Sequence, residues 1–167
     1  MNAALNNSYI LYNLFEIELG DAMDEVNRSY MQIDVKNMRT GKPISFKINV
    51  NNVTMPHRLD LTIPPNKYLV DFAESAIGGD HSYGGMNYYA AKELHMPFDY
   101  GPEVVVVAKQ TTGDPAMRGE KILCTIAHEI LEAELMSTGL PYHIAHMYAM
   151  QYEKGVYGGD PDQRDQL

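Results

Sequence analysis

The sequence lacks several features that mark secreted and membrane-embedded proteins. Its single cysteine, Cys124, excludes a disulfide within the chain. No apolar run approaches the roughly 18 residues that a helix needs to cross a bilayer. The first residues, from Met1 to Asn7, carry no basic segment of the kind that opens a signal peptide. We therefore expect a cytoplasmic protein without a membrane partner.

Basic residues are scarce as well. The chain has 13 lysines and arginines against 22 aspartates and glutamates, which gives a net charge of −9. Nonspecific binding to nucleic acids and to anionic membranes depends on cationic side chains that meet phosphates. A helix-turn-helix protein also needs lysine or arginine on its second helix, and residues 141–153 contain neither. We expect no nucleic-acid partner, and nothing in the sequence indicates the oligomeric state.

What the chain does contain is typical of a globular protein. Hydrophobic residues make up 45% of its 167 residues and charged residues 21%, which is enough apolar material for one core. We expect a single domain over residues 1–154. Residues 155–167, with glycine, aspartate and glutamine and few apolar residues, are expected to form a flexible C-terminal tail.

The strands are predicted from alternation of apolar and polar residues. Met31–Lys36 and Ile44–Val50 alternate in this way, and Val53–Ile63 is predicted as a third strand of an antiparallel meander over residues 30–63. Residues 103–108 include four consecutive valines, which is typical of a buried strand. The sheet is therefore expected to be mainly antiparallel.

The helices are predicted from helical spacing of apolar residues and from their end signals. Asn66 is a candidate N-cap, and Gly139 and Pro141 mark the boundary between the last two helices. The glycine-rich residues 78–85 are expected to form a flexible connector, with a lid or substrate loop as the alternative. Helices are predicted at 66–77, 86–95, 115–137 and 141–153. With the sheet, they give an α+β fold in which the sheet packs against helices.

The most informative stretch is a polar run inside the helix predicted at 115–137. His128, Glu129 and Glu132 stand among apolar residues on either side. Ionisable groups inside a protein cost free energy unless something pairs with them, and a bound metal ion is one such partner. The apolar neighbours form two helical stripes: Ile122, Ile126, Ile130 and Ala133, and Leu123, Ala127, Leu131 and Leu135.

The spacing of these polar residues fits a metal site. Positions four apart on a helix lie about 40° apart around the axis and one turn along it, so His128 and Glu132 project side by side. An imidazole nitrogen and a carboxylate oxygen placed in this way can bind the same ion. Glu129 lies about 100° from His128 around the axis, where it can act as a base on a water molecule beside the ion.

Further candidates follow on the helix predicted at 141–153. His146 is the first choice for a third metal ligand. His143 can be a fourth ligand, a hydrogen-bond donor to a developing oxyanion, or a surface histidine. Glu153 can orient a ligand histidine from behind, or it can be a surface residue at the helix end. Cys124, one turn before His128, is interpreted as a small buried residue and not as a ligand.

The run Ala127-His128-Glu129-Ile130-Leu131-Glu132 resembles the HExxH helix of the zincin metallopeptidases, with Glu132 in the place of the second histidine. A valine-rich strand before this helix and a second helix after it are similar to small zincin-like proteins, so the resemblance covers residues 103–153. It implies a zincin-like metal-binding helical hairpin in the C-terminal half. In that hairpin His128 and Glu132 are metal ligands and Glu129 is the catalytic base.

These residues together predict a metal-dependent hydrolase. The expected cofactor is a divalent metal, with Zn²⁺ first; Mn²⁺ or Fe²⁺ are alternatives, because the carboxylate of Glu132 favours harder ions than imidazole does. The expected reaction is that of a peptidase or an amide hydrolase, with a peptide or protein as a possible substrate, Glu129 as general base and His143 or Tyr142 as oxyanion donor. Two alternatives stay open: a solvated charged helix face without metal, and a non-catalytic binding or assembly module with a structural metal or no metal.

Overall fold

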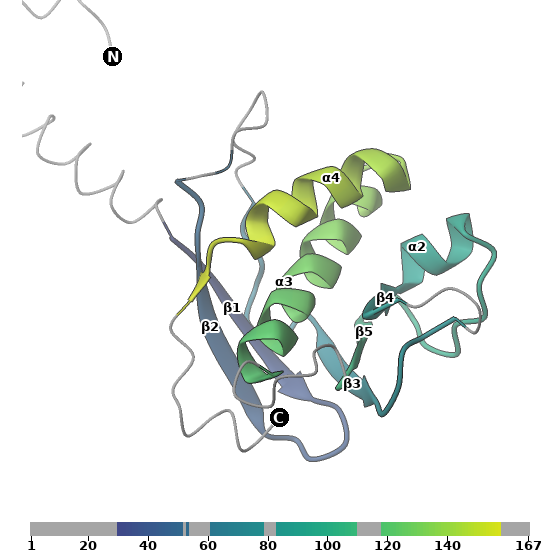
Figure 1. Cartoon of the computed structure of the whole chain (residues 1–167), viewed down its shortest axis with the longest axis horizontal. Coiled ribbons are helices and arrows are strands. Elements are labelled where there is room, and N and C mark those ends of the chain that lie inside the picture. Colours follow the sequence, from purple (N-terminus) through teal and green to yellow (C-terminus); the bar gives the residue numbers. More distant parts are fainter. Residues whose placement is uncertain (1–29, 52, 54–60, 79–82, 110–117, 158–167) are drawn as a thin grey trace, which may run out of the picture.

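The computed structural model of the chain describes residues 30–51, 53, 61–78, 83–109 and 118–157. Its fold is α+β, as predicted (Figure 1). The elements in chain order are β1 Tyr30–Asn37, β2 Pro43–Asn49, β3 Leu69–Ala73, β4 Gly85–Asn87, α2 Tyr88–Glu93, β5 Val104–Ala108, α3 Arg118–Ser137, α4 Tyr142–Glu153 and β6 Val156–Tyr157.

The strands form one six-stranded sheet in the order β4-β5-β3-β1-β2-β6. Pairing is antiparallel between β1 and β2, between β2 and β6, and between β4 and β5, whereas β3 is parallel to both β1 and β5. Antiparallel pairings are therefore the majority, which agrees with the predicted mainly antiparallel sheet. Alternate residues of β1 and β2, such as Ile33 and Phe46, enter the core, as their apolar–polar alternation predicted.

The prediction of a helix at 66–77 was wrong, because residues 69–73 form the strand β3 in the middle of the sheet. Asn66, the expected helix cap, takes a left-handed conformation with φ of 59° in the turn before the strand. The short apolar run Leu69–Ala73 fits both helical and strand spacing. Pairing with β1 and β5 buries Val70 completely and settles the choice in favour of a strand.

Two further predictions need correction. The third strand at Val53–Ile63 falls mostly on residues 54–60, which lie outside the described residues, and residues 53 and 61–63 are not in a strand. The tail expected from Gly155 onward instead begins with β6, which pairs with β2. Gly155 packs so closely on the carbonyl oxygen of Asn49 that a Cβ would not fit. The absence of a side chain at this position therefore allows close packing of two backbone segments and is not a sign of flexibility. Residues 158–167 lie outside the described part.

The helices at the C-terminal end agree well with the prediction. α3 and α4 occupy Arg118–Ser137 and Tyr142–Glu153, and Gly139 follows α3 with φ of 106°, as a helix-ending glycine should. The start predicted at residue 115 lies outside the described residues. The helix expected at 86–95 is shorter, because residues 85–87 belong to β4 and α2 begins at Tyr88.

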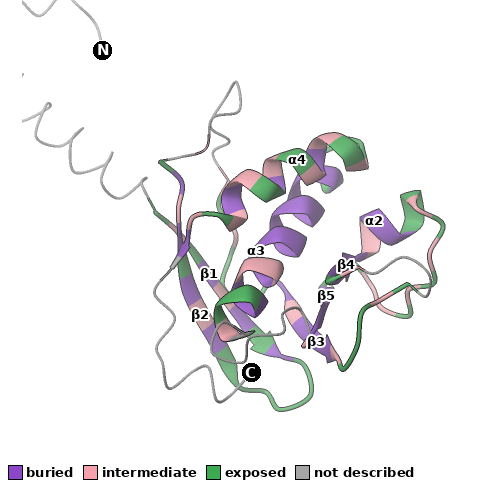
Figure 2. Cartoon of the chain, viewed as in Figure 1, coloured by how far each residue is buried: buried purple, intermediate pink, exposed green. Residues whose placement is uncertain are grey.

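α3 is the central helix of the fold. It contacts β4, β5 and β6 of the sheet, while α4 and α2 pack against it (Figure 1). Every residue from Ile126 to Met136 is buried, so this part of the helix has no solvated face (Figure 2). Among the described residues, no helix combines the length and the apolar character that crossing a bilayer requires.

Candidate metal centre

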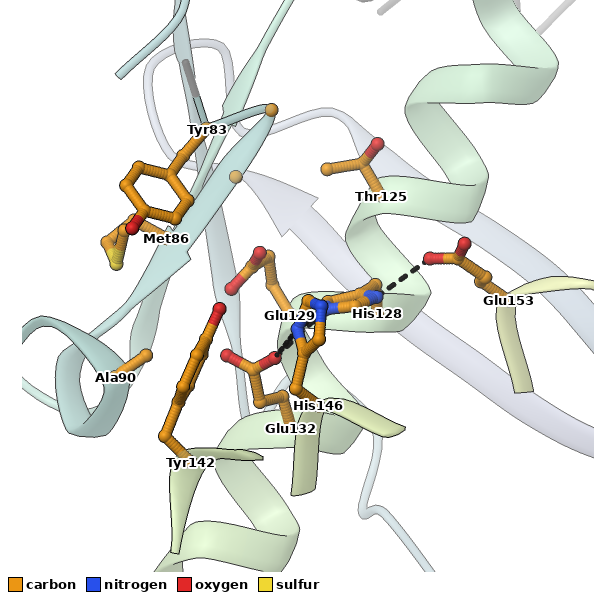
Figure 3. A pocket seen from close by; sticks show the side chains of 12 residues that line it. Tyr83, Met86, Ala90, Thr125, His128, Glu129, Glu132, Tyr142, His146 and Glu153 are labelled. Atoms are coloured by element: carbon orange, nitrogen blue, oxygen red, sulfur yellow. Dashed lines mark hydrogen bonds and ion pairs between the residues drawn. The ribbon is translucent and has the colours of Figure 1, made fainter. Parts of the chain in front are cut away.

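Three side chains from α3 and α4 point at one another beside the sheet (Figure 3). His128 Nε2 lies 2.9 Å from Glu132 Oε2, as the one-turn spacing on α3 predicts. From α4, His146 Nδ1 lies 3.0 Å from His128 Nε2 and 2.9 Å from Glu132 Oε2. Three atoms that are all suitable metal ligands thus form a triangle with nearly equal sides.

The triangle fits a divalent metal ion. Zinc ligands lie about 2.0–2.2 Å from the ion, so tetrahedral ligands are about 3.3 Å apart. The sides of the triangle need to widen by only a few tenths of an ångström to reach this separation. Two imidazole nitrogens and one carboxylate oxygen are also a donor set found at zinc sites. The cluster His128, Glu132 and His146 can therefore hold a metal ion.

Glu153 orients one of the two histidines. Its Oε2 lies 2.7 Å from His128 Nδ1, on the opposite side of the ring from the triangle. When the imidazole is neutral, a proton on Nδ1 donates to this carboxylate, and Nε2 keeps its lone pair for a ligand. A carboxylate behind a histidine ligand is a common arrangement at metal sites, where it fixes the ring and raises its basicity.

The carboxylates around His128 also change its affinity for protons. Burial alone would lower the pKa of His128, but hydrogen bonds with Glu132 and Glu153 outweigh this effect and raise it to about 10. In the metal-free protein the imidazole is therefore protonated at neutral pH. A metal ion that binds here has to displace this proton, so the affinity for metal falls as the pH is lowered.

Glu129 lies beside the triangle without being part of it. Its Oε2 accepts a hydrogen bond of 3.0 Å from Asn87 Nδ2, which also donates to Glu132 Oε1 at 3.0 Å. Burial, and after it the charge of Glu132, raises the pKa of Glu129 to about 8. A nearby cation would lower this pKa again, toward the neutral range in which a general base works best.

The cluster opens into a cavity of about 350 Å³. β4 forms one wall and passes so close to α3 that a Cβ on Gly85 would lie 2.6 Å from Glu129 Cγ and 2.9 Å from Thr125 Cγ2. Only glycine allows this approach. Tyr142 on α4 forms another wall, and its ring extends toward the two carboxylates of α3 (Figure 3). Burial and the charge of Glu132 raise the pKa of Tyr142 to about 12, so its hydroxyl keeps its proton and can donate.

Most of the residues singled out in the sequence meet in this site. His128, Glu132 and His146 form the triangle, and Glu129 and Glu153 contact or flank it. His143 does not join them: it is exposed on α4 and is not among the residues that line the cavity.

Asn87 and Gly85 are among the residues of the site that were not predicted. Asn87 precedes α2, and an asparagine before a helical run is a signal for an N-cap, but the helix was predicted to begin at residue 86, two residues before α2 begins, which placed Asn87 inside the helix. Gly85 was assigned to a connector, since a glycine pair by itself does not distinguish a loop from a close approach of two elements.

Comparisons with models of protein families, with curated proteins and with solved structures found no match to this chain.

Proposed function

We propose that the chain is a metal-dependent hydrolase that cleaves a peptide or amide bond at the cluster of His128, Glu132 and His146. The observation that carries the proposal is the convergence of three ligand atoms, 2.9–3.0 Å apart, at the wall of a cavity. The resemblance of this helix to the zincin motif agrees with the same assignment.

The expected ion is Zn²⁺, with Mn²⁺ and Fe²⁺ as alternatives because one of the three ligands is a carboxylate. When bound, such an ion supplies Lewis acidity: it polarises a substrate carbonyl and makes a water molecule more acidic. The carboxylate ligand adds negative charge to the site and weakens this effect compared with a site of neutral ligands. The chain compensates with Glu129, a base held at the same place.

The roles of the protein side chains follow from their positions. Glu129 is buried beside the triangle and faces the cavity, so it can take the proton of an attacking water molecule. The phenol of Tyr142 is protonated and directed into the cavity, so it can donate a hydrogen bond to the oxyanion of a tetrahedral intermediate. We assign this role to Tyr142 in preference to His143, which is exposed outside the cavity.

The number of ligands favours a catalytic site over a structural one. Structural zinc sites have four protein ligands, whereas catalytic sites have three and leave a position for water or substrate. In the described part of the chain the cluster offers three ligands and borders a cavity. A closed site would need a fourth ligand such as His143, whose exposed position separates it from the cluster.

Metal analysis and hydrolysis assays test the proposal together. The purified protein should carry about one equivalent of divalent metal, as a single mononuclear site would, and His128→Ala combined with Glu132→Ala should abolish binding. A library of fluorescence-quenched peptides should be cleaved by the wild type. Glu129→Gln should keep the metal and lose the cleavage, whereas Glu120→Gln, a change on the exposed part of α3, should keep both.

Each result separates one part of the proposal from the rest. Absence of metal from both the wild type and the double variant, even after incubation with zinc, would end the site hypothesis. Equal activity of wild type and Glu129→Gln would remove Glu129 from the mechanism. Tight metal binding without hydrolysis of any peptide would favour the alternative of a binding or assembly module with a structural metal.

A further inference from the structure

Asn87 connects the strand β4 to both carboxylates of the candidate metal centre. It is almost completely buried and precedes α2, whose first turn it caps: Oδ1 accepts a hydrogen bond of 3.0 Å from the backbone N–H of Ala90. Its Nδ2 donates to Glu129 Oε2 and to Glu132 Oε1, each at 3.0 Å. The amide oxygen thus accepts one hydrogen bond, and both N–H groups of the amide donate one.

These three hydrogen bonds allow only one orientation of the amide. If the amide turned over, its oxygen would face two carboxylate oxygens, and its NH₂ group would face the N–H of Ala90, so that like groups would meet on both sides. Because the amide is buried, water cannot relieve such contacts. The backbone of α2 therefore determines which end of Asn87 is presented to Glu129 and Glu132.

This arrangement divides the two oxygens of Glu132 between different tasks. Oε1 accepts from Asn87, whereas Oε2 lies 2.9 Å from both His128 Nε2 and His146 Nδ1 and completes the triangle. Carboxylates can bind metal ions through one oxygen or through two, and the choice changes the number of positions left for water or substrate. The hydrogen bond that Asn87 donates to Oε1 opposes binding of the ion through both oxygens.

We propose that Asn87 is a positioning residue that makes Glu132 bind the ion through Oε2 alone and keeps Glu129 apart from the ion. The inference rests on the proposed metal site. A one-oxygen Glu132 leaves the ion with three protein ligands and favours the low coordination number that zinc prefers. Without Asn87, Glu132 can use both oxygens, and the site changes toward the larger coordination number of Mn²⁺ and similar ions.

The neutral amide is also suited to this place because it carries no charge. Glu129 and Glu132 are both buried, and their like charges disfavour each other. A lysine or arginine would satisfy them, but its positive charge would repel a divalent cation a few ångströms away. Asn87 supplies two N–H groups to the two side chains without adding a positive charge that would repel the ion.

The test separates positioning of the carboxylates from simple capping of α2. Asn87→Ser keeps a side-chain oxygen that can cap the helix but is too short to reach both carboxylates, whereas Asn87→Ala removes the cap as well. Asn37→Ser is the matched control, since Asn37 is another buried asparagine whose side-chain oxygen accepts hydrogen bonds from a turn, but on β1. Zinc and manganese affinities and the absorption spectrum of the cobalt-loaded protein are measured for all variants.

Both Asn87 variants should bind zinc about 10–100-fold more weakly, the usual effect of losing a group that holds a metal ligand. They should lose less affinity for manganese, and their cobalt spectra should weaken in the way that a rise in coordination number produces, while Asn37→Ser matches the wild type. A wild-type spectrum and wild-type affinities in Asn87→Ser, with changes only in Asn87→Ala, would reduce Asn87 to a helix cap and overturn the proposal.

A measurement on the wild type covers the case in which the variants do not fold. A crystal structure of the zinc-loaded protein should show Glu132 bound through Oε2 alone, with Oε1 on Asn87. Binding of zinc through both oxygens would refute the role of Asn87 and leave the metal site intact. Failure of the wild type to bind zinc, manganese or cobalt would instead refute the proposed function itself.

Discussion

His128 Nδ1 lies 2.7 Å from Glu153 Oε2, so a residue at the last turn of α4 determines how a residue in the middle of α3 presents its other nitrogen. The two residues are 25 positions apart in the chain, and the turn at Gly139 brings them together. Because the carboxylate holds the proton on Nδ1, Nε2 is left to face Glu132 and His146. The packing of α4 on α3 therefore determines which face of the imidazole meets Glu153 and which nitrogen faces Glu132 and His146, as well as the position of the ring.

The first prediction concerns this carboxylate. Glu153→Ala should weaken zinc binding about 10–100-fold, because the ring of His128 loses both its orientation and part of its basicity. Glu153→Gln should lose less zinc affinity, since the amide oxygen can still accept a hydrogen bond from Nδ1 although it carries no negative charge. Competition with a coloured chelator measures both affinities. Glu120→Gln, at an exposed position of α3, is the control. An equal loss of zinc affinity in this variant would mean that the effect comes from the net charge of the protein and not from the contact with His128.

The second prediction concerns the stability of the metal-free protein. Folding raises the pKa of His128 from 6.5 to about 10, chiefly through Glu132 and Glu153 acting against burial, and that of Glu129 from 4.5 to about 8, through burial and Glu132. The folded state thus holds these protons more tightly than the unfolded state does. Their stabilising contribution is complete at low pH and is lost as the pH rises through these folded-state values.

The free energy of unfolding of the chelator-treated protein should therefore fall as the pH is raised across the neutral range toward 10. Urea denaturation at a series of pH values measures it. Glu129→Gln should remove the contribution of Glu129, which is lost between about pH 4.5 and 8, and leave that of His128, which is lost between about pH 6.5 and 10. A metal-free wild type whose stability rises steadily over the same interval would contradict the assignment of these protons.

The site was easier to predict than the sheet, and the reason is physical. His128 and Glu132 are four residues apart on one helix, so helical geometry alone places them together. His146 needed only one further assumption, namely that the break at Gly139 folds α4 back onto α3. The contact between His128 and Glu132 is local in the chain, whereas the contacts of His146 also depend on how the two helices pack.

The strands and contacts that could not be predicted from the sequence depend on residues that are far apart in the chain. β3 was mistaken for a helix because its five residues fit both periods, and only its neighbours β1 and β5 decide between them. Asn87 lies more than 40 residues from both carboxylates that it contacts, and no local spacing indicates that contact. The C-terminal strand β6 depends in the same way on β2.

The third prediction concerns Cys124, which was interpreted as a small buried residue and is half-buried in the structure. Burial, and after it the charge of Glu153, raises the pKa of its thiol to about 11. Only the thiolate reacts with disulfide reagents, so the reaction should be slow at neutral pH and accelerate about tenfold per pH unit below the pKa. Cys124→Ala should retain the metal; loss of one equivalent in this variant would make Cys124 a ligand after all.

The last prediction concerns the close approach of β4 to α3. A Cβ at Gly85 would lie 2.6 Å from Glu129 Cγ and 2.7 Å from its Oε1, so Gly85→Ala should push the Glu129 side chain out of place. We expect a loss of stability of about 1–3 kcal/mol, as in other overpacked interiors. Hydrolysis of the peptide library should fall strongly while zinc stays bound, because the displaced group is the base and not a ligand.

Gly101→Ala is the matched control for this variant. Its Cβ would also meet a glutamate, but Glu103 is exposed and its side chain can rotate away, so stability and hydrolysis should both stay near the wild type. Thermal denaturation, metal content and cleavage rate are compared for the two variants. Cleavage by Gly85→Ala as fast as by the wild type would contradict the role of Glu129 as the base, because the added Cβ would lie within 2.7 Å of both Cγ and Oε1 of its side chain.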